Sequence, residues 1–377
     1  MTAYRIVIAA GGTGGHFFPA EALAAELRRR GHFVALMTDA RSGGLVSPAF
    51  EGCERIVLAG AGIAGRGVVK AVRAMFALAM GTIAARRKLR MLGAAVVAGF
   101  GGYPSVAPVL GARMPIAGTG GRRPRILLHE QNAVLGRANR LLSRMADVLA
   151  LGQDGTAAIP AGVVAELTGN PVRPAIAALF GLGYQPPGET ISLLVLGGSL
   201  GARVFSDVVP GALAALPEAL RSRLRVVQQC RAEDIERVRA AYAASGIAAD
   251  LAPFFADVAS LLSAAHLVIS RAGASSVAEL AVAGRPSVLV PLPGAIDDHQ
   301  TANASALAEA GGAVVVRQAD LTAQGLADLL GGLLAAPERL AAAAAAAATC
   351  GRPNAAATLA DAVERLAASH QTREHSA

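Results

Sequence analysis

The chain has 377 residues, a formal net charge of +8 at pH 7 and a hydrophobic content of 53%, much of it alanine. This length suits two α/β domains better than a single core, and the positive charge favours phosphates or anionic lipid as partners. The lack of Trp and of any recognisable binding module argues against nucleic acid. The isolated cysteines Cys53, Cys230 and Cys350 indicate neither a metal site nor a disulfide framework.

The N-terminal segment predicts a strand, a glycine-rich turn and a helix. A run rich in β-branched residues at 4–10 leads into the turn, and Pro19 is expected to open the helix. The turn consists of Gly11, Gly12, Thr13, Gly14, Gly15 and His16. Glycines let the backbone approach a phosphate, and a helix N-terminus supplies free N–H groups. We expect no signal peptide and no membrane span, because the chain enters a strand at once and carries no long uncharged stretch.

Apolar runs alternate with helical stretches along the whole chain. The remaining runs of the first half are 32–38, 94–98, 125–129 and 147–151, and those of the second half are 191–196, 224–228, 267–270, 286–290 and 313–316. Such alternation is typical of βαβ units in parallel sheets. The proline-marked segment 170–174, followed by 185–188, is the best candidate for an interdomain connection. A helix at about 354–368 is expected to pack back on the first domain, and the tail 369–377 is expected to fray.

A second glycine-rich turn at 197–202, which contains Ser199, follows the run 191–196. One such turn is weak evidence of function. Two of them, half a chain apart and each opening an α/β unit, predict two nucleotide-binding-type domains that face a shared cleft.

The helical segment 67–90 combines a bulky apolar surface with many cations. Its main members are Lys70, Arg73, Met75, Phe76, Met80, Ile83, Arg86, Arg87 and Lys88. An interfacial helix that sits among anionic head groups needs this combination. An ordinary crossover helix that buries its apolar face shows the same pattern, and the residues alone favour that second interpretation.

Further glycine-rich or polar clusters fall where strands should end, which is where open α/β sheets place their ligands. These clusters are 99–103, 129–132, 169–173, 271–279 and 298–303. Together with the two glycine-rich turns, and in the same order, they resemble the MurG family of peptidoglycan glycosyltransferases. The resemblance extends to about Leu366, with departures at Pro104–Ser105, 119–123 and 294–299.

The resemblance implies the GT-B fold: an α/β protein of two Rossmann-like domains whose parallel sheets face a cleft. It implies an acceptor-binding and membrane-associating domain at 1–170, with the helix at about 353–368 packed on it. A UDP-GlcNAc-binding domain would span 171–352. It also implies a peripheral enzyme on the cytoplasmic face of the inner membrane, bound to the anionic leaflet, which favours the interfacial interpretation of 67–90.

The activity implied is inverting transfer of N-acetylglucosamine from UDP-GlcNAc to the C4 hydroxyl of lipid I, the undecaprenyl-pyrophosphoryl-MurNAc-pentapeptide. The product, lipid II, serves peptidoglycan synthesis and hence cell shape and division. No Asp-x-Asp motif occurs, and we expect neither a metal nor another cofactor. His16 is the leading catalytic candidate, as base or acceptor-diphosphate ligand; Glu130 is the alternative base or a loop-orienting residue, and Tyr103 contacts the acceptor.

For the donor, the resemblance implies that Glu279 accepts the ribose hydroxyls and that Arg173 and the Phe255 backbone flank the uracil. Residues expected at the phosphates and the sugar are Thr13, Gly14, Gly15, Asn132, Ser199, Ala274, Ser275 and Gln300. A capping, packing or helix-dipole role is the alternative for each of these residues.

Other functions remain open at this point. A nicotinamide oxidoreductase would explain Asp39 at the end of the second strand, but the first turn lacks Gly-x-Gly-x-x-Gly and ends in His16. A UDP-GlcNAc 2-epimerase, a diacylglycerol glucosyltransferase and a non-catalytic nucleotide-sugar-binding protein also fit the fold. The turns at 99–103 and 129–132 favour the peptidoglycan transferase over them.

Overall fold

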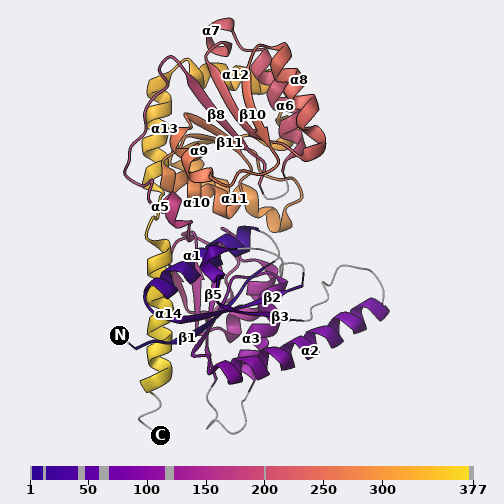
Figure 1. Cartoon of the computed structure of the whole chain (residues 1–377), viewed down its shortest axis with the longest axis vertical. Helices are drawn as coiled ribbons and strands as arrows, with labels where there is room; N and C mark the ends of the chain where they lie inside the picture. Colours follow the sequence, from indigo (N-terminus) through magenta and orange to yellow (C-terminus); the bar gives the residue numbers. More distant parts are fainter. Residues whose placement is uncertain are drawn as a thin grey trace. The chain divides into compact units, whose positions relative to one another are not determined.

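The computed structural model describes residues 2–11, 14–40, 47–58, 68–114, 123–198 and 201–372. The chain forms two compact units: unit 1 is Met1–Arg173 with Asn354–Ala377, and unit 2 is Pro174–Pro353. Each unit contains one parallel sheet covered by helices (Figure 1).

Unit 1 has a seven-stranded sheet in the order β3-β2-β1-β4-β5-β6-β7. The strands are β1 (Arg5–Ala9), β2 (Phe33–Asp39), β3 (Glu54–Leu58), β4 (Val96–Gly99), β5 (Arg125–Glu130), β6 (Val148–Leu151) and β7 (Ala165–Leu167). All neighbouring pairs are parallel, and the order reverses between β1 and β4. In such sheets ligands bind at the carboxyl ends of the strands where the order reverses.

Alternation along β1 supplies the two cores of unit 1. Ile6 and Ile8 pack with α1 and α14, whereas Val7 and Ala9 pack with α2 and α3 on the opposite face. The helices are α1 (Gly14–Arg29), α2 (Val68–Leu92), α3 (Val106–Arg113), α4 (Arg137–Leu142) and α14 (Ala355–Thr372). Short 3₁₀ turns are η1 (Pro48–Phe50), η2 (Tyr103–Ser105) and η3 (Ser143–Met145).

Unit 2 has a six-stranded parallel sheet in the order β10-β9-β8-β11-β12-β13. The strands are β8 (Ile191–Leu196), β9 (Leu224–Gln229), β10 (Ala248–Ala252), β11 (Leu267–Ser270), β12 (Ser287–Leu289) and β13 (Ala313–Val315). The helices are α5 (Pro174–Ala177), α6 (Arg203–Ala214), α7 (Glu218–Arg221), α8 (Ile235–Ala244), α9 (Val258–Ala264), α10 (Ala274–Ala283), α11 (His299–Glu309), α12 (Ala323–Leu334) and α13 (Pro337–Thr349). Its 3₁₀ turns are η4 (Ala232–Asp234), η5 (Ile296–Asp298) and η6 (Gln318–Asp320).

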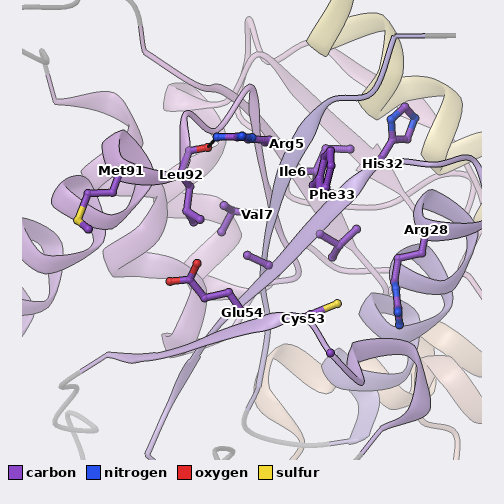
Figure 2. Close-up of a pocket in the computed structure, with 13 residues that line it drawn as sticks. Arg5, Ile6, Val7, Arg28, His32, Phe33, Cys53, Glu54, Met91 and Leu92 are labelled. Atoms are coloured by element: carbon purple, nitrogen blue, oxygen red, sulfur yellow. Dashed lines mark hydrogen bonds between the residues drawn. The ribbon is translucent and has the colours of Figure 1, made fainter.

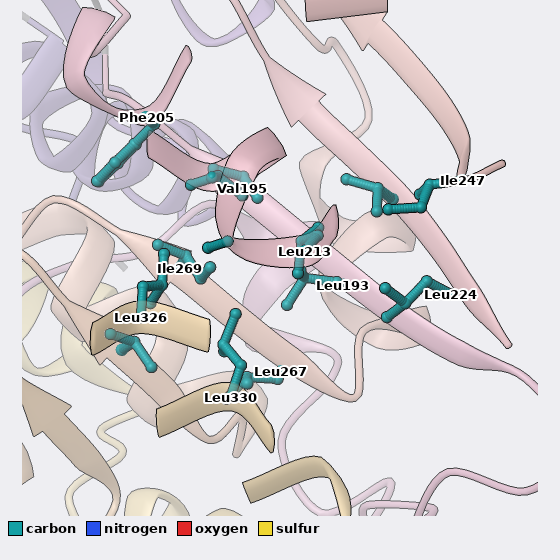
Figure 3. Close-up of a cluster of buried hydrophobic side chains, with 14 of the residues drawn as sticks. Leu193, Val195, Phe205, Leu213, Leu224, Ile247, Leu267, Ile269, Leu326 and Leu330 are labelled. Carbon is teal, nitrogen blue, oxygen red and sulfur yellow. The ribbon is translucent and has the colours of Figure 1, made fainter. Parts of the chain in front are cut away.

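One face of this sheet forms a continuous apolar core. Leu193 and Val195 of β8 pack against Phe205 and Leu213 of α6, and against Leu330 of α12 (Figure 3). The order again reverses between two adjacent strands, here β8 and β11, so unit 2 repeats the doubly wound plan of unit 1.

The C-terminal helix α14 lies along α1 in unit 1 (Figure 1). Nη1 of Arg30 lies 2.6 Å from Oδ1 of Asp361 and 2.7 Å from Oε2 of Glu364. Nε2 of His32 lies 2.7 Å from Oε1 of the same Glu364, and His32 is buried. Polar contacts therefore reinforce an apolar seam that includes Leu359 and Val363.

Several sequence-based expectations on the elements are wrong. Helix α1 begins at Gly14, so Pro19 lies inside the helix instead of opening it. The helix continues through Pro19 because its apolar face, with Leu23 and Leu27, is buried in the core. Helix α14 runs to Thr372, so residues 369–372 are helical.

Three strands, β3, β7 and β10, were not expected from the sequence. All three are edge strands with exposed positions, so none presents the continuous apolar run that marks a buried strand. The expected strands all occur, and their ends differ from the expected ones by at most two residues.

Candidate functional site

In each unit the candidate residues gather where the strand order reverses. In unit 1 the glycine-rich turns after β1 and β4 flank this point, and in unit 2 the turns after β8 and β11 do so. Ligands of doubly wound sheets bind at such points because adjacent loops diverge there and helix N-termini point at the opening.

His16 lies in the first turn of α1 and is partly buried. A Cβ atom added to Gly102, in the turn after β4, would lie 3.5 Å from Cδ2 and 3.7 Å from Nε2 of His16. The imidazole therefore lies against the backbone of the turn after β4. Gly14 and Gly15 begin the same helix, whereas Thr13 lies outside the described residues.

The turn after β4 needs its glycines and is tied to β1. Gly101 and Gly102 have φ values of +79° and +66°, which side chains with a Cβ rarely adopt. The buried Ser105 hydroxyl lies 2.9 Å from the carbonyl oxygens of both Ala9 and Gly101. This contact fixes the turn, and with it Tyr103, at the carboxyl end of β1.

Gln131 connects His16 to a buried histidine. Its Oε1 lies 2.8 Å from Nδ1 of His16, and its Nε2 lies 2.9 Å from Nδ1 of His129. Nε2 of His129 lies 3.0 Å from the carbonyl oxygen of Gly169, after β7. Burial lowers the pKa of His129 to about 4, so this ring is neutral at neutral pH.

Glu130 ends β5 and is only 2% exposed. One carboxylate oxygen accepts from the backbone N–H and the side-chain amide of Asn132, at 3.0 and 2.9 Å. The other accepts from the N–H of Gly136 and the amide of Asn139, both at 2.9 Å. A carboxylate with four donors is well placed to orient the loop 131–139 and poorly placed to take a proton from a substrate.

In unit 2 the glycine-rich turn after β8 is held by Gln229. The backbone N–H of Gly197 donates to Gln229 Oε1 at 3.0 Å, and Gln229 Nε2 donates to the carbonyls of Gly198 and Pro253 at 3.0 and 3.1 Å. One side chain thus joins the turn to the loop that contains the partly buried Phe255. Ser199 lies outside the described residues.

The turn after β11 leads into α10, whose N-cap residue is Gly273. Arg271 is buried and donates to the carbonyls of Val290 and Pro291, at 3.1 and 3.2 Å. Burial lowers the pKa of this guanidinium from its ordinary value. Arg271 therefore ties neighbouring strand ends together just before α10 begins. Ala274 and Ser275 lie in the first turn of α10, and the partly buried Glu279 lies in its second turn.

Two other donor candidates already have intramolecular contacts. Oε1 of Gln300, in α11, accepts from the N–H of Leu292 at 2.9 Å, so its amide N–H groups are the part suited to a sugar. The guanidinium of Arg173 lies 5.3 Å from the ring centre of Phe18, within unit 1. Arg173 was assigned from the sequence to the second domain, and the structure instead includes it in the first.

Helix α2 presents an apolar stripe to solvent. Met75 is 71% exposed, Phe76 68%, Met80 48% and Ile83 55%. The opposite side, with Ala74, Ala85 and Leu89, is buried. A core role for the exposed stripe is therefore ruled out within unit 1. Among the cations of α2, Arg73 and Arg87 are exposed, and Nζ of Lys88 lies 3.5 Å from Oε1 of Glu54. The side chain of Lys70 is not among those that the structure describes.

A pocket of about 420 Å³ lies elsewhere in unit 1 (Figure 2). It is bordered by Arg5 and Phe33, which begin β1 and β2, and by Leu92, which ends α2. These are the amino ends of the strands, opposite the glycine-rich turns. The pocket is therefore separate from the candidate site.

In the part of the chain that the structure describes, no group of three or more His, Cys, Asp or Glu is arranged to hold a metal ion. Over the same residues, no single helix is long and apolar enough to cross a bilayer; α12 and α13 reach that length and composition only as a pair bent by 92°.

Sequence reasoning missed the roles of Gln131, Gln229 and Ser105. Each of these residues directly follows or ends a strand, or lies just after a glycine-rich turn, but each has a partner that is distant in sequence. The contact between Gln131 and His16 spans 115 positions, and that between Gln229 and Gly197 spans 32. A polar residue at a strand end was the available signal, and it does not identify a partner.

Family comparisons cover both units. Residues 6–150 match the glycosyltransferase family 28 N-terminal domain, and residues 192–366 match the family 28 C-terminal domain. The chain is 62% identical over 362 residues to a UDP-N-acetylglucosamine--N-acetylmuramyl-(pentapeptide) pyrophosphoryl-undecaprenol N-acetylglucosamine transferase of Granulibacter bethesdensis, covering 96% of this chain and 93% of that protein.

Solved structures agree on the fold. The chain is similar to Acinetobacter baumannii MurG, with a TM-score of 0.76, 32% identity and coverage of 96% and 99% of the two chains. A UDP-N-acetylglucosamine 2-epimerase from Listeria monocytogenes shares the fold alone, at 17% identity, a TM-score of 0.62 and coverage of 100% and 98%. The predicted GT-B class is confirmed, and the family domains rule against the oxidoreductase. The chain therefore belongs to glycosyltransferase family 28 and, within it, to the MurG family.

Proposed function

We propose that this chain transfers N-acetylglucosamine from UDP-GlcNAc to the C4 hydroxyl of the MurNAc-pentapeptide of lipid I, with inversion, and so forms lipid II. The observation that carries this proposal is the imidazole of His16 against the turn at Gly102, at the reversal point of a family 28 sheet. In this proposal unit 1 binds the acceptor and unit 2 binds the donor.

The reaction forms a bond from the acceptor oxygen to the anomeric carbon and breaks the bond from that carbon to the diphosphate, which leaves with the electron pair as UDP. His16 takes the hydroxyl proton, and Tyr103 contacts the acceptor. Occupation of the Glu130 carboxylate by four donors supports a loop-orienting role for it and leaves His16 as the preferred base.

In this proposal the donor is held mainly by unit 2. The N–H groups at Ala274 and Ser275 begin α10 and stabilise the charge that develops on the diphosphate. Glu279, one turn further along the helix, accepts the ribose hydroxyls. Ser199 contacts the α-phosphate. The Phe255 backbone and Arg173 flank the uracil, and Asn132 and Gln300 bind the GlcNAc hydroxyls. Thr13, Gly14 and Gly15 also contribute to UDP-GlcNAc binding in this proposal.

We place the enzyme at the cytoplasmic face of the bacterial inner membrane as a peripheral protein. The exposed stripe of α2, with Met75, Phe76, Met80 and Ile83, supports insertion among lipid chains. Exposed arginines on the same helix, such as Arg73 and Arg87, add attraction to anionic head groups. This location brings unit 1 to the diphosphate of a membrane-anchored acceptor.

The direct test is incubation of the protein with radiolabelled UDP-GlcNAc and a lipid I analogue carrying a short prenyl chain. We expect one UDP and one β-linked disaccharide product for each turnover. Omission of the analogue is the control and should stop UDP release. An epimerised nucleotide sugar, or UDP release that does not depend on the analogue, would contradict the proposal.

A further inference from the structure

The buried His129 has a single protonation pattern that satisfies its neighbours. Its Nε2 faces the carbonyl oxygen of Gly169 at 3.0 Å. A carbonyl can only accept a hydrogen bond, so Nε2 of this neutral ring carries the proton. Its Nδ1 is consequently an acceptor.

That acceptor determines which way the amide of Gln131 points. Nε2 of Gln131 lies 2.9 Å from His129 Nδ1, 3.2 Å from the carbonyl oxygen of Phe100 and 3.1 Å from that of His129. All three atoms are acceptors, so the NH₂ end of the amide must face them. A flipped amide would direct its oxygen at these three acceptors. Gln131 is only 1% exposed, so water could not relieve the repulsion.

The amide oxygen is thereby directed at His16. Gln131 Oε1 lies 2.8 Å from His16 Nδ1, and because an amide oxygen only accepts, Nδ1 must donate. A neutral imidazole has one N–H group, so its Nε2 then holds the lone pair. This nitrogen is the one that lies beside Gly102, on the side of the glycine-rich turn after β4.

We propose that Gln131 is a positioning residue that holds His16 in the Nδ1–H tautomer, with Nε2 as the atom that accepts a proton. The chain of contacts from Gly169 through His129 and Gln131 to His16 sets this tautomer from the loop that follows edge strand β7. The proton transfer itself rests on the proposed function, whereas the tautomer is a property of the protein alone. An amide orients the ring without placing a carboxylate beside the acceptor diphosphate that unit 1 is proposed to bind.

The first test needs no substrate and no variant of Gln131. Nitrogen-15 NMR of histidine-labelled wild-type protein, at a pH where the rings are neutral, distinguishes the two tautomers. The chain has seven histidines, and His16→Asn identifies the resonances that belong to His16. We expect a protonated Nδ1 and an unprotonated Nε2. The opposite tautomer, or a mixture of both, would overturn the proposal even if every variant of Gln131 failed to fold.

The second test asks whether Gln131 acts through His16. In Gln131→Met the His16 tautomer should shift toward Nε2–H, the form that imidazole prefers in water, and kcat should fall by about tenfold to a hundredfold. KM for UDP-GlcNAc should change by less than about twofold. In a His16→Ala background the same substitution should cost nothing further.

Gln228→Met is the matched control, because Gln228 is equally buried and contacts the Tyr242 hydroxyl at 2.5 Å in unit 2. It should lower stability comparably and leave kcat unchanged. A further loss of kcat in the double variant, or an unchanged tautomer in Gln131→Met, would show that Gln131 merely packs the loop. The expected spectrum without any GlcNAc transfer would support the tautomer and refute the proposed function.

Discussion

Nε2 of His32 lies 2.7 Å from Oε1 of Glu364, so a ring near the beginning of the chain is joined to a carboxylate near its end. The side chain of His32 is only 2% exposed and that of Glu364 is 25% exposed. Arg30 approaches the same carboxylate through its other oxygen. These contacts attach α14 to unit 1 in a partly desolvated environment, where loss of one partner is costly.

We expect Glu364→Ala to lower the free energy of unfolding by about 1–3 kcal/mol, because it leaves the buried Nε2–H of His32 without its acceptor and removes one of the carboxylates that Arg30 contacts. Denaturant unfolding combined with hydrogen exchange in α14 would measure the change. Arg365→Ala is the control on the same helix. This substitution breaks only an ion pair with Glu166, in which the Arg365 side chain is 61% exposed and the Glu166 side chain 33%. It should lower the free energy of unfolding by less than about 1 kcal/mol. Equal losses would contradict the assignment.

Stability should fall as the pH is lowered from about 6.5 towards 4, because of His129. Burial lowers the pKa of this ring from 6.5 to about 4 in the folded protein. Between these values the unfolded chain binds a proton that the folded chain does not, so unfolding is favoured as pH falls. The free energy of unfolding, measured at several pH values across this range, should change with pH by the amount expected for uptake of about one proton on unfolding. His129→Gln should flatten this pH dependence; an unchanged slope would assign the effect to another group.

His16→Ala should reduce turnover by about a hundredfold or more while leaving UDP affinity nearly unchanged, as expected for a base or an acceptor-diphosphate ligand. Steady-state kinetics and calorimetric titration with UDP measure the two quantities. Turnover close to that of the wild type would transfer the role to another residue, with Glu130 the next to be tested.

Glu279→Ala should weaken UDP-GlcNAc binding by about 2–3 kcal/mol, because charge-assisted hydrogen bonds to the ribose are lost. With a 2′,3′-dideoxyribose donor the same substitution should have a far smaller effect. Glu338→Ala removes an exposed carboxylate from the first turn of α13 and should leave both affinities unchanged. Equal losses with the two donors would remove the ribose assignment.

The exposed stripe of α2 should bind anionic vesicles at low salt and release them as salt rises through the screening range. Replacing Phe76 and Met80 by serine should weaken sedimentation with vesicles and leave UDP-GlcNAc affinity unchanged. Phe33→Ser is the matched control, since Phe33 is 65% exposed in the same unit and Phe76 is 68% exposed. Normal vesicle binding by the double variant would place the membrane contact elsewhere.

Central strands could be predicted from the sequence because both of their faces are largely buried, which produces apolar runs such as 191–196, interrupted only by Ser192. Edge strand β3 could not, since Glu54, Arg55 and Val57 face solvent and break the pattern. The same limit applied to the site. The motifs located the strand ends, but the partnership of Gln131 with His16 depends on the sheet order β1-β4-β5, which no local pattern specifies.

The position of α14 has a consequence for how the protein is made. Unit 1 begins at the N-terminus but includes Asn354–Ala377, so the sequence of unit 2 interrupts it. During synthesis the continuous segment Pro174–Pro353 can fold as soon as it emerges, whereas unit 1 waits for the last residues of the chain to cover the face formed by Ile6 and Ile8. A ribosome that stalls before α14 has emerged would therefore release a chain whose unit 2 is folded and whose unit 1 still exposes part of its core.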